Sequence, residues 1–360
     1  GGGSPAGGGS TAGGGRTAGG GSTAGGGSTA GGGSTAGGGS TAGGGNTAGG
    51  GNTAGGGNTA GGGAPMPATC DGGFVRVTTA LTNGVVDVAV VGPGDVWVVG
   101  TGQPFMVHVT DGGASGAAVA CGVDYFAAWA RADGRVYAGA SGAVWRRDQV
   151  SGTCSMLDMV MSGNVESVWG TPATGTQQTL FAVTTSGHVA YLGDGVTVTR
   201  PDEDIADDLH VIEGFSANAV FAGGMNGGSS KGAIYFFDGG TWATTYDGPN
   251  GTEIFAMTFV SPTLGWAGGY GDNLLRWNGA AWVQDMASPP GMTQVRGLKA
   301  FSASAIYAVG NRDEIMRWNG QAWLKVGDAP PGVELEQIRG TSECDLYVVG
   351  RSGYVGTTRH

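Results

Sequence analysis

The chain has 360 residues, of which 79 are glycine, and a formal net charge of −11 at pH 7. Its Lys and Arg residues form no cluster, which argues against binding to nucleic acid or to an anionic membrane surface. It has no run of eighteen apolar residues, so no membrane-spanning segment is expected.

Residues 1–63 repeat a six-residue unit, GGGxTA, ten times and end with a last GGG. The fourth position is Ser, Asn or, once, Arg, which indicates that it faces water, because an unpaired Arg is costly to bury. The first three positions are always Gly and the sixth is always Ala, so another backbone can approach closely. Representative positions at which we expect such an approach are Gly1, Gly2, Gly3, Ala12, Ala24, Ala36, Ala48 and Ala60.

A tract so rich in Gly and Ser is ordinarily a flexible coil. The strict period is more than flexibility requires, however. An ordered tract without large side chains needs backbone hydrogen bonds to neighbouring copies. We therefore expect residues 1–63 to form a homo-oligomer or polymer, as three-residue-per-turn helices of the polyglycine II type. Silk-like strands are the alternative geometry, whereas collagen is excluded because no register gives Gly at every third position.

Residues 64–72 contain Pro65 and Pro67 and are expected to form a hinge, followed by a head over residues 73–360. In the head, a short apolar strand that mostly ends in Gly recurs every 39 to 45 residues. Such a period, with four short strands per unit, is typical of a β-propeller. The sequence therefore predicts an all-β, seven-bladed propeller. The seven marker strands are Asp95–Gly100, Arg135–Gly139, Thr179–Thr184, Ala219–Gly223, Gly265–Gly268, Ile306–Gly310 and Leu346–Gly350.

Tight turns and paired tryptophans recur at fixed places in these units. Asn278-Gly279 and Asn319-Gly320 follow the third strand of their units and predict hairpins with positive φ angles. Asp111-Gly112, Asp194-Gly195 and Asp238-Gly239 mark the same turn elsewhere. Tryptophans five residues apart flank two of the turns: Trp277 with Trp282, and Trp318 with Trp323. Because the repeat fixes their position, packing between blades is favoured over a sugar-stacking site.

The seventh unit ends one strand short. We expect Phe74–Thr79, at the start of the head, to supply the missing strand, which would close the ring and remove an exposed sheet edge. This arrangement brings Cys70 and Cys344 to the same end of the seventh blade and predicts a disulfide between them. Cys121 and Cys154 then pair by exclusion. An even number of widely spaced cysteines fits an oxidising compartment, the alternative being four buried free thiols.

The sequence contains no catalytic constellation. The densest acidic run, Pro201–Asp208, does not match a calcium loop and is interpreted as a solvated loop between blades. The four histidines, His108, His188, His210 and His360, are scattered singly. We therefore predict no catalytic residue, metal site or cofactor, and no enzymatic activity.

The segments Leu264–Gly269 and Phe237–Trp242 resemble the Asp-box, or BNR-type, repeats of β-propellers, including those common in secreted bacterial and especially myxobacterial proteins. The resemblance covers residues 74–358 and implies the fold rather than an activity. Some members of the wider group are sialidases with a Tyr nucleophile and three Arg that bind a carboxylate, a set that cannot be assigned here. Arg276 and Arg317 recur at one repeat position and are interpreted as structural.

These observations predict an extracellular or cell-surface structural protein whose glycine repeats assemble into a filament that displays propeller heads. The chain begins inside a repeat, as expected of a mature chain after removal of a targeting segment. The alternative is a cell-surface propeller on a flexible tether that binds a glycan or a protein, and a secreted hydrolase is the least favoured reading.

Overall fold

The structure is a computed structural model that describes residues 73–359, except residues 104, 112, 120, 158–160, 172–178, 193–197, 207, 227–230 and 272. All described residues belong to one unit, Gly62–His360. The predicted shaft (1–63) and hinge (64–72) lie outside the described residues. Within the described part of the chain, no helix is long and apolar enough to cross a bilayer.

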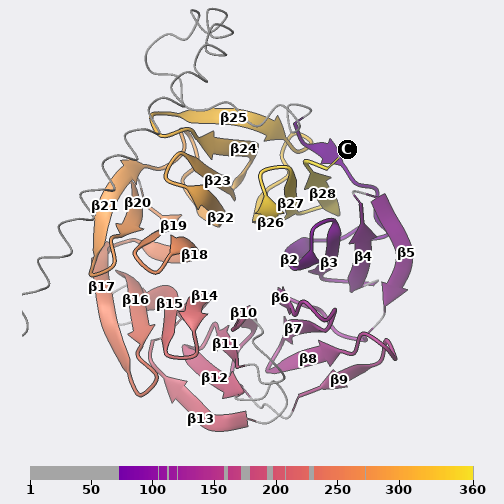
Figure 1. The fold of residues 1–360 in the computed structure, drawn as a ribbon, viewed down its shortest axis with the longest axis horizontal. Coiled ribbons are helices and arrows are strands. Elements are labelled where there is room, and N and C mark those ends of the chain that lie inside the picture. The colour runs from indigo at the N-terminus through magenta and orange to yellow at the C-terminus, as the bar shows by residue number, and fades with distance from the viewer. Residues whose placement is uncertain are drawn as a thin grey trace, which may run out of the picture. The chain divides into compact units, whose positions relative to one another are not determined.

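The described residues form seven four-stranded antiparallel sheets, arranged as blades around a common centre (Figure 1). The predicted all-β, seven-bladed propeller is therefore confirmed. Blades 1 to 3 consist of β2 (Val85–Gly92), β3 (Asp95–Gly100), β4 (Met106–Thr110) and β5 (Gly113–Val119); β6 (Ala127–Ala130), β7 (Val136–Ala140), β8 (Ala143–Arg147) and β9 (Cys154–Met156); and β10 (Val165–Gly170), β11 (Leu180–Thr184), β12 (His188–Leu192) and β13 (Val198–Asp204).

The remaining blades follow the same order from the centre outward. They consist of β14 (Asp208–Ser216), β15 (Ala219–Asn226), β16 (Lys231–Phe237) and β17 (Trp242–Asn250); β18 (Glu253–Ser261), β19 (Leu264–Tyr270), β20 (Asn273–Trp277) and β21 (Trp282–Ala287); β22 (Val295–Ser302), β23 (Ala305–Gly310), β24 (Arg312–Trp318) and β25 (Trp323–Asp328); and β26 (Leu335–Ser342), β27 (Asp345–Gly350), β28 (Tyr354–Thr357) and β1 (Val75–Arg76).

The marker strands of the sequence are the second strands of the blades. They are buried along nearly their whole length, for example in β7, β11 and β23, because the neighbouring blades cover both of their faces. A strand buried on both faces reads as a continuous apolar run rather than an alternating one. This is why these segments are the clearest signal in the sequence.

The hydrophobic core is divided among the interfaces between adjacent blades. One cluster joins Phe221 of blade 4 to Ile254, Trp277 and Trp282 of blade 5. The rings of Trp277 and Trp282 lie 5.6 Å apart, and that of Phe221 lies 5.0 Å from Trp277. The predicted role of the tryptophan pairs in packing between blades is confirmed.

The two ends of the head meet in blade 7. β1 pairs with β28 in antiparallel register, Val75 opposite Thr357 and Arg76 opposite Gly356. Val77 and Val85 share a core cluster with Tyr347 and so continue the interface into blade 1. The prediction that Phe74–Thr79 closes the ring is confirmed, although the paired strand is only two residues long.

Two sequence expectations need correction. In the Asn-Gly turns only the glycine has a positive φ, 94° at Gly279 and 95° at Gly320. Asn278 instead accepts the backbone N–H groups of Ala280 and Ala281, each at 2.9 Å. The acidic run 201–208 is mostly strand rather than loop, because residues up to Asp204 belong to β13 and Asp208 begins β14.

Candidate functional site

A ring of seven side chains surrounds the centre of the propeller near the start of the inner strands. In six inner strands the residue in the ring is a β-bulge, one extra residue inserted between two paired neighbours. In blade 2 it immediately precedes β6. All seven residues line a cavity of about 210 Å³. We call this set the first ring: Val86, Phe126, Glu166, His210, Phe255, Arg296 and Glu336.

Bulges redirect a side chain out of the regular alternation of a strand and are frequent beside active sites. Here the same device occurs at the equivalent place in successive blades. The first ring is therefore built by the repeat, whereas its chemistry varies from blade to blade, with two carboxylates, one imidazole and one guanidinium.

A second set of polar residues lies two positions before each first-ring residue. It contains four carboxylates and two amides, and we call it the entrance ring: Gly84, Asp124, Asn164, Asp208, Glu253, Gln294 and Glu334. The entrance ring and the first ring together are termed the mouth. By their equivalent positions in the repeat, six carboxylates are assigned to the mouth, with Arg296 as its only permanent cation. One of them, Asp124, accepts the backbone N–H of Gly102 at 2.7 Å.

Asp208, His210 and Glu253 form the most compact group in the mouth. The Nε2 atom of His210 lies 2.7 Å from Oε1 of Glu253 and 3.6 Å from Oδ2 of Asp208. Burial by itself lowers the pKa of His210, but the hydrogen bond to Glu253 and the charges of Asp208 and Glu253 outweigh it and raise that pKa. The His210 ring also packs against Phe255, with centroids 4.6 Å apart.

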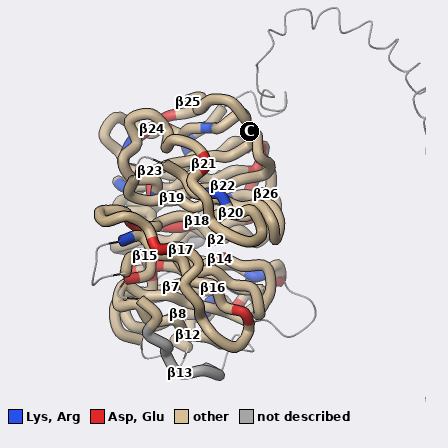
Figure 2. The backbone as a smooth tube through the Cα atoms, turned by 90° about the vertical axis from the view of Figure 1, so that its left-hand side faces the viewer, with Lys and Arg blue, Asp and Glu red and all other residues tan. Residues whose placement is uncertain are grey.

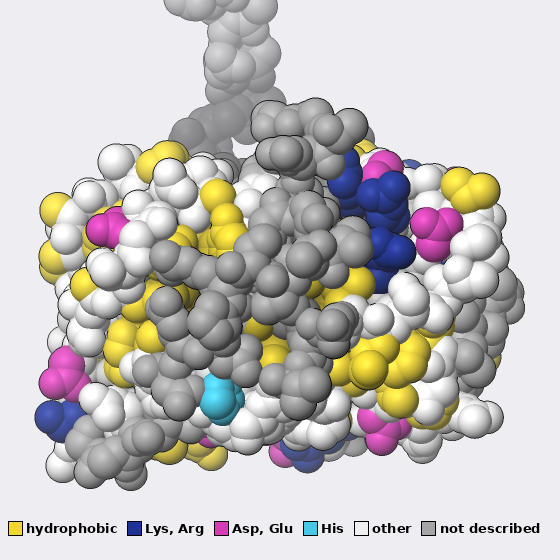
Figure 3. Space-filling view, turned by 90° about the horizontal axis from the view of Figure 1, so that it is seen from below, with side chains coloured by type: hydrophobic (Ala, Val, Ile, Leu, Met, Phe, Trp, Pro, Cys, Tyr) yellow, Lys and Arg dark blue, Asp and Glu magenta, His cyan; other side chains and the backbone are white. Residues whose placement is uncertain are grey.

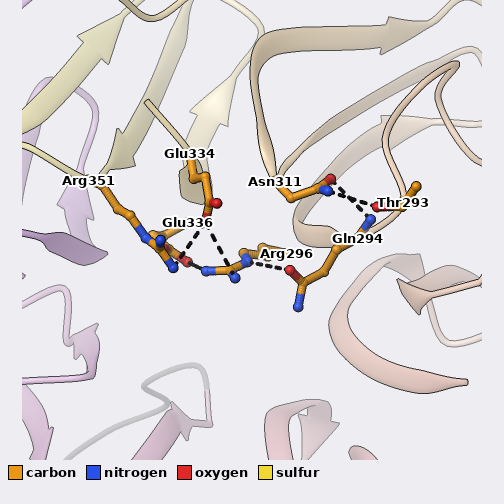
Figure 4. A network of polar contacts seen from close by, with 7 residues as sticks. All are labelled: Thr293, Gln294, Arg296, Asn311, Glu334, Glu336 and Arg351. Carbon is orange, nitrogen blue, oxygen red and sulfur yellow. Dashed lines mark hydrogen bonds and ion pairs between the residues drawn. The ribbon is translucent and has the colours of Figure 1, made fainter. Parts of the chain in front are cut away.

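On the opposite side of the mouth, two arginines balance two carboxylates (Figure 4). Arg351, from the turn before β28, lies 3.0 Å from Glu334 and 3.1 Å from Glu336. Arg296 pairs with Glu336 and donates a hydrogen bond of 3.0 Å to Gln294. This half of the mouth is an extended ion-pair network.

A second ring of side chains lies deeper in the centre, three positions after each first-ring residue: Ala89, Trp129, Trp169, Glu213, Thr258, Lys299 and Arg339. Six of these residues line another cavity of about 210 Å³. Arg339 pairs with Glu213 at 2.8 Å and lies 3.8 Å from Asp87. Burial raises the pKa of Asp87, although Arg339 opposes this.

Hydrogen bonds between inner strands join neighbouring blades, and their acceptor side chains lie one to three positions after the first ring. The Asp87 carboxylate accepts the N–H of Ala128 at 2.8 Å, and Ser167 accepts that of Ile212 at 3.2 Å. Thr258 accepts the N–H of Ala300 at 3.1 Å. These bonds fix the inner strands against one another and hold the mouth rigid.

Outside the mouth, charges of both signs are interspersed along the blades (Figure 2). The edge of the ring that contains β13 exposes apolar side chains in several places, and Lys and Arg side chains gather at one spot on it (Figure 3). The chain as a whole is acidic, and the mouth concentrates six carboxylates around a single arginine at the centre of the ring.

The predicted site residues fall into three groups. Cys121 and Cys154 form a disulfide with their Cα atoms 5.6 Å apart, which joins the segment before β6 to β9. Cys344 lies in the turn between β26 and β27, but Cys70 lies outside the described residues, so the pair Cys70–Cys344 stays a prediction. The assembly positions Gly1, Gly2, Gly3, Ala12, Ala24, Ala36, Ala48 and Ala60 also lie outside the described residues.

The arginines at the recurring repeat position make structural contacts. The Arg317 side chain is only 3% exposed and lies 2.8 Å from Glu343 in the next blade. Arg276 donates a hydrogen bond of 3.0 Å to Asp285. Their interpretation as structural residues agrees with these contacts.

Solved structures share the fold of the head. YCF48 bound to a D1 peptide is 13% identical with a TM-score of 0.60, and the match covers 79% of this chain and 95% of that chain. YCF48 from Cyanidioschyzon merolae is 14% identical with a TM-score of 0.60 and coverage of 79% and 98%. The streptogramin B lyase structure is 10% identical with a TM-score of 0.63 and coverage of 79% and 96%.

The head shares the β-propeller fold with these proteins. A WD40 propeller, that of RRP9, matches as well, at 10% identity and a TM-score of 0.61 over 79% of this chain and 97% of that one. At these identities the likeness shows the fold alone. No protein-family model and no curated protein matches the chain.

Sequence reasoning missed the mouth. Its residues come from seven units that lie about one repeat length apart, so His210 and Glu253 are 43 residues apart and no local motif contains both. One signal was present: when the units are aligned on their marker strands, acidic or amide residues recur two positions before the bulge.

Proposed function

We propose that the propeller head is a non-enzymatic binding module that takes a basic segment of a protein ligand at its acidic mouth. The proposal rests on the charge of the mouth, where six carboxylates stand against Arg296 and the nearby Arg351. Around a concave site of one sign, the field attracts ligands of the opposite sign and speeds their association.

The volume of the cavity limits the size of the group that can bind in it. A cavity of about 210 Å³ accommodates one or two side chains rather than a folded domain. A Lys or Arg side chain would place its charge near Glu166 and its apolar stem beside Phe126 or Phe255. The solved structure of YCF48 with a D1 peptide supports a peptide as the class of ligand for this fold. A glycan ligand is less favoured, because charged groups dominate the polar part of the mouth.

A non-enzymatic role is favoured by the composition of the first ring. Its seven residues include no Ser, Cys, Lys or Tyr that could act as a nucleophile beside His210. The extracellular location is supported by the Cys121–Cys154 disulfide, because such bonds persist in oxidising compartments.

Titration of the full chain with a lysine-rich peptide, in the presence of a chelator, tests the proposed ligand. Asp124→Asn and Glu166→Gln each remove one mouth carboxylate and are expected to weaken binding roughly tenfold, or ~1.4 kcal/mol. Asp247→Asn, on the exposed side of β17, is the matched control and is expected to bind as the wild type does. Equal binding of an acidic peptide, or no effect of either mouth variant, would refute the proposal.

A second function rests on the strict six-residue period of residues 1–63. We propose that these repeats assemble the protein into an extracellular filament that displays the heads, since close-packed Gly and Ala backbones can satisfy one another's hydrogen bonds. Negative-stain microscopy of the full chain is expected to show fibres. Deletion of 1–63 should abolish them and leave the folded head, and single particles from the full chain would contradict assembly.

A further inference from the structure

Asp208 and His210 lie on β14 in blade 4, and Glu253 begins β18 in blade 5. One ligand atom of each residue lies within 4.8 Å of the other two. Their side chains are well shielded from solvent, with exposures of 25% for Asp208, 13% for His210 and 16% for Glu253. Three potential ligands from two blades therefore converge on one point at the mouth.

This group carries more negative charge than its own atoms neutralise. Glu166, the first-ring residue of blade 3, adds a third carboxylate close enough to interact with both His210 and Asp208. Even a protonated His210 leaves two negative charges in a partly desolvated place, which is costly.

One carboxylate oxygen of Asp208 accepts no hydrogen bond from the described residues. This atom, Oδ1, is buried. Buried polar atoms are nearly always satisfied by protein, water or an ion. The orphaned oxygen belongs to the same carboxylate that faces His210.

We propose that Asp208, His210 and Glu253 bind one divalent first-row transition-metal ion, such as Zn²⁺, which cross-links blades 4 and 5. Zinc ligands lie about 2.0–2.2 Å from the ion, so tetrahedral neighbours are roughly 3.3–3.6 Å apart. The 3.6 Å between His210 and Asp208 already fits this spacing. The 2.7 Å between His210 and Glu253 would open by roughly 0.6 Å as the ion replaces the shared proton.

The donor set selects the class of metal. An imidazole with two carboxylates suits zinc and its first-row neighbours, whereas calcium and magnesium prefer oxygen ligands alone. The His210 ring packs against Phe255, which restricts the orientation of the imidazole. His210 and Glu166 both line the cavity of the first ring, so an ion bound by His210 would lie beside that cavity.

Calorimetric titration of the chelator-treated full chain with ZnCl₂ tests this site. The expected result is one equivalent of Zn²⁺ and a higher melting temperature, because the ion binds only the folded state. His210→Gln and Glu253→Gln should each weaken binding by at least about tenfold. The repeat tract cannot contribute a site, since residues 1–63 contain no His, Cys, Asp or Glu.

His108→Gln is the matched control. His108 lies on β4 in blade 1, 2.6 Å from Asp95, and is not part of the group formed by Asp208, His210 and Glu253, so its loss should leave zinc binding unchanged. Circular dichroism establishes that each variant is folded, and Asp208→Asn replaces any variant that is not. Absence of zinc binding in the wild type, or full binding by folded His210→Gln or Asp208→Asn, would overturn the proposal. Failure of the lysine-rich peptide to bind would leave it standing, because that titration is done with chelator.

Discussion

The first and second rings of the propeller centre are built from equivalent positions of the same repeat, yet they differ in charge balance. In the second ring, Arg339 lies between Glu213 and Asp87, and its pKa is raised because their charges outweigh the effect of burial. At the first ring, His210 alone faces Glu166, Asp208 and Glu253. With Asp87 included, the charges at the second ring balance, two carboxylates (Asp87 and Glu213) against two cations (Lys299 and Arg339), whereas the group around His210 has an excess of carboxylates.

Two neighbouring levels of the same inner strands therefore have different roles. A neutralised buried network holds blades together, because removing any member leaves another charge uncompensated. An unbalanced cluster is maintained at a cost to stability, which is typical of sites that take a ligand. Charge balance, rather than position in the fold, is therefore the feature that identifies the candidate site.

The largest expected effect is on the second ring. Arg339→Met keeps much of the side-chain volume but leaves Asp87 and Glu213 without their cation. We expect a loss of about 3–5 kcal/mol in the free energy of unfolding, as found when one partner of a buried pair is removed. Urea denaturation followed by circular dichroism measures it. A loss below about 1 kcal/mol would show that this ring is not a balanced network.

A smaller effect of opposite sign is expected in the first ring. Glu166→Gln removes a carboxylate whose pKa is raised by burial, with Asp208 and Glu336 acting in the same direction. The variant should be at least as stable as the wild type at pH 7, by a margin under about 1 kcal/mol. The same urea titration, made with chelator, gives the value. Clear destabilisation would mean that Glu166 is as well compensated as the second-ring charges.

The smallest effect, and one that depends on pH, is expected at Lys299. Burial lowers the pKa of this ammonium group, although Glu213 opposes the shift. Because the folded-state pKa lies below the ordinary lysine value of 10.5, the cost of burying the charge is complete at neutral pH and is relieved as the pH rises toward that value. Lys299→Met should therefore match or slightly exceed the wild type at pH 7, by under about 1 kcal/mol.

The advantage of Lys299→Met should shrink as the pH rises through the lowered pKa. The measurement is the difference in unfolding free energy between the two proteins from pH 7 to about pH 10. An advantage that grows with pH would contradict the direction of the shift. A large loss at pH 7 would place Lys299 in the same balanced network as Arg339.

The fold could be predicted from the sequence because its signals are local and repeated. The second strand β3 matches its predicted marker residue for residue, and β27 (Asp345–Gly350) begins one residue before its marker, whereas β15 and β19 extend two to three residues beyond theirs. Ring closure by Phe74–Thr79 followed from counting strands in the last unit. The Cys121–Cys154 pair followed from the same count, because placing Cys70 and Cys344 together in blade 7 left only these two cysteines to pair.

The mouth could not be predicted, for a geometric reason. A β-bulge changes the face of the sheet to which a side chain points. The residues around Glu166 and His210 contain no sequence signal for the inserted residue. The acidic run before His210 was interpreted as a loop, although it continues through β13 to the start of β14. The partner Glu253 is 43 residues from His210, and only the ring brings them together.

The two-residue pairing of β1 with β28 has a mechanical consequence. The chain leaves the propeller toward its N-terminus through β1, so any pull on residues 1–72 is transmitted to a strand held by Val75 and Arg76 and by the 2.8 Å bond from Val77 to Val355. The predicted disulfide between Cys70 and Cys344 would transfer the force to blade 7 before it reached the pairing of β1 with β28. Reduction of that link would then let a pull on the N-terminal segment open the ring at one defined edge, the pairing of β1 with β28.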